Sequence, residues 1–158
     1  MRTALKIGFS FGLTSGVITT LGLMVGLHAG THSMPAVLGG ILTIAVADAM
    51  SDALGIHVAE ESKNHGNTHD IWASTAATFS AKFVIAGTFA VPVLFLPLDL
   101  ALVVSLIWGL SLLAVLSYAL ARAQRVPPWK VIGEHVLIGL SVVAISHYLG
   151  EWVRATFS

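Results

Sequence analysis

Residues 36–58 read AVLGGILTIAVADAMSDALGIHV, an apolar stretch that carries two acids, Asp48 and Asp52. About 20 apolar residues are enough for a helix to cross the hydrocarbon core of a bilayer. A charged side chain near the bilayer centre costs roughly 2.5–3.5 kcal/mol even on insertion-based scales, so acids at this depth usually serve a function. The stretch therefore predicts a membrane-spanning helix with a functional polar centre.

The composition of the whole chain also indicates a membrane protein. Of its 158 residues, 56% are hydrophobic and 10% are charged, whereas soluble domains carry about 25% charged residues. Five segments are long and apolar enough to span a bilayer. We therefore predict an all-α integral membrane protein with a single domain, residues 1–158, and spans at residues 7–28, 36–58, 73–96, 100–121 and 131–152.

The distribution of basic residues predicts the orientation of these spans. Lys82 lies inside the third span and Arg154 follows the fifth, while the other six basic residues fall on the side of the N-terminus. The positive-inside rule then predicts a cytoplasmic N-terminus, and five spans place the C-terminus outside. The first span lacks an A-x-A-like cleavage site, so we read it as a retained helix.

Composition also excludes several classes of function. The chain has no cysteine, which removes disulfides, thiolate metal sites and thiol redox chemistry. Its formal net charge is zero, whereas a nucleic-acid-binding protein needs a basic face. We expect no permanently bound cofactor and no nucleic-acid partner.

The two acids of the second span are spaced to act together. Residues i and i+4 are neighbours on one face of a helix, so Asp48 and Asp52 can converge on one ion. Crowded carboxylates seldom stay ionised together without a cation or a proton, which suggests metal transport coupled to protons by antiport. The alternative is that the acids hydrogen-bond to neighbouring helices or neutralise Lys82. For Lys82 itself, we expect the side chain to snorkel toward the cytoplasmic surface.

The cytoplasmic end of the second span supplies further candidate ligands. His57 and Glu61 are an i, i+4 pair, and Glu60 lies beside them. The predicted metal-binding residues are therefore Asp48, Asp52, His57, Glu60 and Glu61. Three more polar residues follow in the loop and are explained as well by an ordinary solvated surface: His65, His69 and Asp70. Near the fifth span, Glu134 is expected to pair with the basic residues at positions 122, 125 and 130.

Glycines recur every four residues along the first span. Gly8, Gly12 and Gly16 form one series, and Gly22, Gly26 and Gly30 form a second. Small residues at this spacing let helix backbones approach closely in membranes. The pattern fits contact between helices of one chain and a dimer interface equally well.

Motifs along nearly the whole chain resemble those of a known family. They are Ser10-Phe11-Gly12-Leu13-Thr14, Gly22-Leu23 and Gly26-Leu27 in the first span, Ala47-Asp48-Ala49-Met50-Ser51 and Leu54-Gly55 in the second, Gly87, Pro92 and Pro97 around the third, and Gly139, Tyr148, Leu149 and Gly150 in the fifth. In this order the set resembles the vacuolar iron transporter family of divalent-cation exporters. The chain resembles a short member that lacks the cytosolic metal-binding domain.

The resemblance implies a homodimer in which the first two spans of both subunits line a path for Fe²⁺ or Mn²⁺, exchanged for protons. Members export the metal from the cytosol, which points here to the plasma membrane of a prokaryote. The chain departs from the family at three positions. Phe11 and Ile44 stand where the family has acids, and Asp52 stands where it has a metal-contacting methionine.

Two other classes of function fit a pair of membrane acids. An intramembrane aspartic protease needs two carboxylates that face each other and share a proton, but Asp48 and Asp52 are one turn apart on one helix. A membrane adaptor without transport activity would use the acids only to hold helices together, and Asp48→Asn would then alter stability more than flux.

Overall fold

The computed structural model describes residues 2–63 and 67–157, and within these ranges it is helical throughout apart from short connections. Its eight helical elements are α1 (Arg2–Thr31), α2 (Met34–Thr43), the π-helical turn η1 (Ile44–Asp48), α3 (Ala49–Glu61), α4 (Thr68–Thr88), α5 (Ala90–Phe95), α6 (Leu98–Gln124) and α7 (Pro128–Phe157).

Five helical segments are long and apolar enough to cross a membrane, which confirms the predicted number of spans and supports a multi-pass membrane protein. They are Ala4–Thr31, Met34–Glu61, Thr68–Phe95, Leu98–Gln124 and Pro128–Phe157. Each extends beyond the predicted bounds at one end or both. The polar residues at the ends of each apolar segment continue the backbone hydrogen bonding of the helix, and hydropathy does not register this.

Two of the five spans are not regular α-helices. In the second, the N–H of Ala49 bonds to the carbonyl of Ile44 across five residues, so η1 separates α2 from α3. In the third, α4 ends at Thr88 and α5 begins at Ala90, just before Pro92. Proline has no N–H to donate to the carbonyl four residues earlier, and its ring crowds that carbonyl. The break between α4 and α5 follows from that proline.

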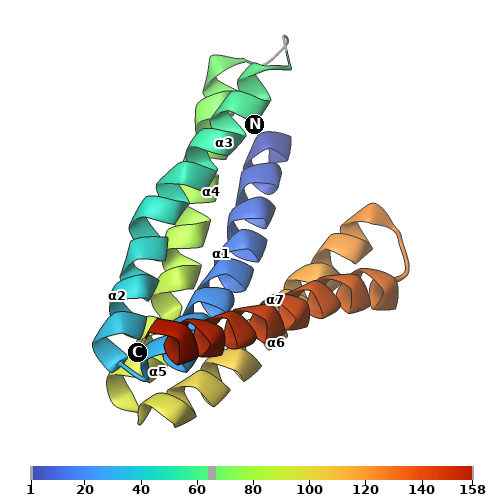
Figure 1. The fold of residues 1–158 in the computed structure, drawn as a ribbon. Helices are drawn as coiled ribbons and strands as arrows, with labels where there is room; N and C mark the ends of the chain where they lie inside the picture. The colour runs from blue at the N-terminus through green and yellow to red at the C-terminus, as the bar shows by residue number, and fades with distance from the viewer. Residues whose placement is uncertain (1, 64–66, 158) are drawn as a thin grey trace.

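Helix α1 is the central element of the fold. It packs against α4 along its N-terminal half, against α7 along its C-terminal half, and also against α2 and α6. The hairpin of α6 and α7 leans away from the N-terminal half of α1 (Figure 1). The buried core runs along α1 through Val17, Leu21 and Met24. This arrangement brings α1, η1 and α4 together in the middle of the molecule.

Both glycine series of α1 form contacts within the chain. A Cβ on Gly8 or Gly12 would collide with backbone of α4 at Ser74 or Thr78. A Cβ on Gly26 would lie 3.3 Å from the carbonyl oxygen of Ser146, and one on Gly30 would lie 3.4 Å from that of Gly150, both on α7. The close approach of α1 to its neighbours therefore accounts for both series without a second subunit.

Gly150 offers a test of this packing. A Cβ at this position would collide with the backbone carbonyl of Gly26, so we expect Gly150→Ala to lower the free energy of unfolding by about 1–3 kcal/mol through overpacking. The measurement is unfolding in mixed micelles with rising SDS, followed by circular dichroism. Gly133→Ala is the control, because Gly133 also lies in α7 but has open space around its Cα. Equal stability of the two variants would contradict the packing.

Candidate functional site

Lys82 of α4 is fully buried in the middle of the fold. A Cβ on Gly16 of α1 would lie 3.3 Å from Cγ of Lys82 and 3.4 Å from its Cα, so this glycine makes room for the lysine stem. The prediction that Lys82 snorkels to the surface is therefore wrong. The ammonium stays inside because anionic partners lie within its reach.

Those partners form a compact group. The Nζ of Lys82 lies 2.5 Å from Oδ2 of Asp48 and 2.6 Å from Oδ2 of Asp52. It also donates to Oγ of Ser15 on α1 at 3.0 Å, and the Ser15 hydroxyl donates to Oδ2 of Asp52 at 2.6 Å. We call these four residues, Ser15, Asp48, Asp52 and Lys82, the ionic cluster. The two carboxylates converge on one cation, and that cation is Lys82. The structure therefore shows the alternative arrangement, in which the acids neutralise Lys82.

The two aspartates of the ionic cluster have different surroundings. Asp52 accepts hydrogen bonds from Lys82 and Ser15, and its side chain is 20% exposed. Asp48 is 37% exposed, and its contact with Lys82 lies outside hydrogen-bond geometry, so its Oδ2 has an ion pair but no aligned donor. Asp48 is also the last residue of η1, and single π-helical turns often occur at functional sites. Asp52 therefore combines its ion pair with two hydrogen bonds, whereas Asp48 has the ion pair with Lys82 alone.

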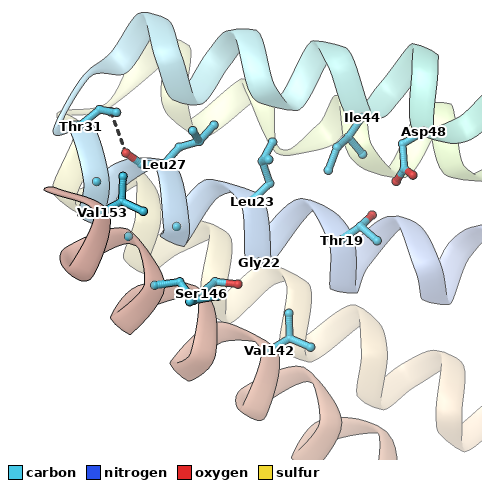
Figure 2. A pocket seen from close by; sticks show the side chains of 14 residues that line it. Thr19, Gly22, Leu23, Leu27, Thr31, Ile44, Asp48, Val142, Ser146 and Val153 are labelled. Atoms are coloured by element: carbon cyan, nitrogen blue, oxygen red, sulfur yellow. Dashed lines mark hydrogen bonds between the residues drawn. The ribbon is translucent and has the colours of Figure 1, made fainter. Parts of the chain in front are cut away.

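Asp48 lines a cavity of about 750 Å³ between α1, η1 and α7, and this cavity is largely open to the surface of the molecule. Figure 2 shows its carboxylate pointing toward Thr19 of α1, with Val153 and Thr31 at the far end of the cavity. The walls are mostly apolar or small residues, and Thr19 and Ser146 add hydroxyl groups. One face of the ionic cluster therefore opens on a space large enough for a hydrated ion.

The charges of the ionic cluster do not cancel. Counted formally, as two carboxylates and one ammonium, the ionic cluster carries one negative charge in the middle of the helical bundle. An uncompensated charge in such surroundings is costly, so the cluster favours uptake of a further cation or a proton.

The other predicted ligands do not join this group. His57 contacts Oγ1 of Thr75 through Nδ1 at 3.0 Å, Glu60 pairs with Lys63 at 2.5 Å, and Glu61 is exposed. His65 lies outside the described residues. Within the described ranges, no three His, Asp or Glu side chains are close enough together to hold a metal ion. In this state the five predicted residues are not gathered into one metal site.

Sequence reasoning missed Ser15, the residue of α1 that reaches the ionic cluster. Phe11, four residues earlier, is exposed, and Ile44 is buried beside the cavity. The expected ion pair of Glu134 is also wrong, since Glu134 forms none within residues 2–63 and 67–157.

A scan of protein-family models finds none that matches this chain, and a search of curated proteins finds no significant match.

Proposed function

We propose that this protein is a membrane carrier that exchanges a cation for protons at the ionic cluster. The observation that supports the proposal most directly is the position of Asp48. Its carboxylate contacts a buried ammonium on one side and lines the 750 Å³ cavity on the other. A carboxylate placed in this way can pass from the internal cation to one that arrives through the cavity.

In this proposal Lys82 holds the place of the transported ion. While the site is empty of cargo, its ammonium keeps two neighbouring carboxylates from repelling each other. An arriving cation first meets Asp48, which has no aligned hydrogen bond to lose. Asp52 then turns toward the same ion, and Lys82 releases its proton as a divalent cation arrives, so that two carboxylates and one divalent cation balance in charge. Protons that bind the carboxylates reverse the exchange and release the cargo.

The nature of the cargo follows from ligand chemistry and from the family resemblance. Carboxylate and hydroxyl oxygens suit hard or intermediate divalent cations. The resemblance narrows these to Fe²⁺ or Mn²⁺, exported from the cytosol by a homodimer whose first two helices line the path. The identity of the metal, its export from the cytosol and the homodimer are all part of the proposal.

Flux measurements with the purified protein in liposomes test the proposal. Fe²⁺, Mn²⁺, Mg²⁺ and Zn²⁺ are supplied outside, with a dye for metal and a dye for protons inside. We expect uptake of Fe²⁺ or Mn²⁺ with proton movement in the opposite direction. Absence of flux for all four ions, from protein that is folded by circular dichroism, would overturn the carrier.

A second candidate function is a membrane adaptor without transport activity. The complete burial of Lys82 favours it, since the ammonium ties α4 to α3 and η1 as an ionic lock would. This geometry does not support an intramembrane aspartic protease. Such an enzyme needs two carboxylates that share a proton, and an ammonium beside both carboxylates disfavours that sharing.

A further inference from the structure

The turn between α6 and α7 forms a basic pocket far from the ionic cluster in sequence. It is a cavity of about 510 Å³ lined by Arg122, Arg125, Val126, Pro127 and Pro128. We call it the turn pocket. Its position follows from the end of α6, where the N–H of Val126 bonds back to the carbonyl of Ala121 and the chain reverses into α7.

The arginines of the turn pocket have no acidic partner. Neither Arg122 nor Arg125 forms an ion pair with an acid in the described part of the chain, and the same holds for Lys130 nearby. A guanidinium group carries five N–H donors in a planar fork that matches the oxygens of a phosphate. Two unpaired arginines lining one cavity therefore present an anion-binding surface.

The backbone of Arg125 supports a role for its side chain. Arg125 caps α6 with a φ of 58°, in the left-handed region. Glycine adopts this conformation without the steric cost that a Cβ brings, and it is the usual residue at such a helix end. Arg122 also lies near the carbonyl end of α6, where basic side chains interact favourably with the helix dipole. Arginine therefore stands at a position where glycine would be less strained.

The surroundings of the turn pocket indicate a lipid rather than a dissolved anion. The pocket lies where two helices that are long and apolar enough to cross a membrane end, and the ends of such helices are expected near the lipid head groups. Trp129, next to the pocket in sequence, is 71% exposed, and tryptophan is enriched at this interface. Basic pockets between membrane helices on the cytoplasmic side bind anionic head groups. We propose that the turn pocket binds the phosphate of an anionic phospholipid in the leaflet on the side of the N-terminus.

Trp129 is the reporter for the test. The full chain carries Trp72→Phe, Trp108→Phe and Trp152→Phe, so that fluorescence comes from Trp129 alone. It is reconstituted in phosphatidylcholine vesicles that contain the same fraction of brominated phosphatidylglycerol or brominated phosphatidylcholine. We expect the anionic lipid to associate near Trp129 at least about threefold more strongly, as judged from quenching. Equal quenching by the two lipids would overturn the proposal.

Variants separate the turn pocket from general attraction to the membrane. The excess quenching should disappear in Arg122→Gln with Arg125→Gln, and it should persist in Arg154→Gln, because Arg154 lies near the opposite end of α7. Arg125→Gly should be at least as stable to heat as the parent and still lose most of the excess. If either pocket variant keeps the full excess, the site is elsewhere. Millimolar inorganic phosphate is also added at constant ionic strength. If it removes the excess quenching by the anionic lipid, the turn pocket binds a dissolved anion, and the proposal of a lipid site is overturned.

Discussion

Replacing Lys82 with methionine is expected to lower the free energy of unfolding by about 3–5 kcal/mol, the usual cost of removing one partner from a buried ion pair. Methionine fills much of the space of the lysine stem but leaves Asp48 and Asp52 without their shared cation. The measurement is unfolding in SDS micelles followed by circular dichroism. Lys63→Met is the control, because Lys63 pairs with Glu60 at the surface, where an ion pair contributes about 0–1 kcal/mol.

A second substitution shows whether the loss comes from charge. Asp52→Asn in the Lys82→Met background removes one of the two stranded carboxylates, so it should restore part of the lost stability. The pair of substitutions should then depart from additivity by about 1 kcal/mol or more. Additive effects, or a Lys82→Met variant as stable as the parent, would mean that the ionic cluster does not hold the helices together.

Replacing Asp48 with asparagine is expected to reduce cation flux at least tenfold, which corresponds to about 1.4 kcal/mol in the rate-limiting free energy, while it changes stability by less than Lys82→Met does. Asp48 lines the cavity and has no aligned hydrogen bond, so its charge serves the arriving ion more than the packing. Flux is measured in proteoliposomes that contain equal amounts of folded protein.

Two further variants, Asp52→Asn and Asp99→Asn, are measured for flux and stability beside Asp48→Asn. Asp52 accepts hydrogen bonds from Lys82 and Ser15, so its replacement should lower stability as well as flux. Asp99, almost fully exposed at the start of α6, should affect neither strongly. An Asp48→Asn variant that keeps normal flux but loses stability would favour the adaptor.

The sequence predicted the five spans and the convergence of the two acids for clear reasons. Long apolar segments have few stable alternatives to a membrane-spanning helix, and the i, i+4 spacing places two carboxylates on one face of any helix. The breaks in the second and third spans differ in this respect. Pro92 signals the break between α4 and α5, whereas no residue in Ile44–Asp48 distinguishes a π-helical turn from an α-helical one.

The sequence favoured a transported ion over Lys82 as the partner of the two acids, whereas the structure places Lys82 between them. Lys82 and Asp48 each lie about ten residues from the N-terminal side of the bilayer, counted from residues 73 and 58, so their depths match. The matching depths of Lys82 and Asp48 favour an ion pair between them. The long lysine side chain, which suggested snorkelling, is a weaker indication. Ser15 carried no comparable signal, because its role depends on which face of α1 packs against α4.

The most direct test of the central claim is equilibrium binding of Mn²⁺ to the purified protein. Free aqueous Mn²⁺ gives a strong electron paramagnetic resonance signal that falls when the ion is bound. We predict saturable binding by the wild-type protein and its loss in the Asp48→Asn, Asp52→Asn double variant, with both proteins folded by circular dichroism. The same binding curve for the two proteins would contradict a cation-binding role for the ionic cluster.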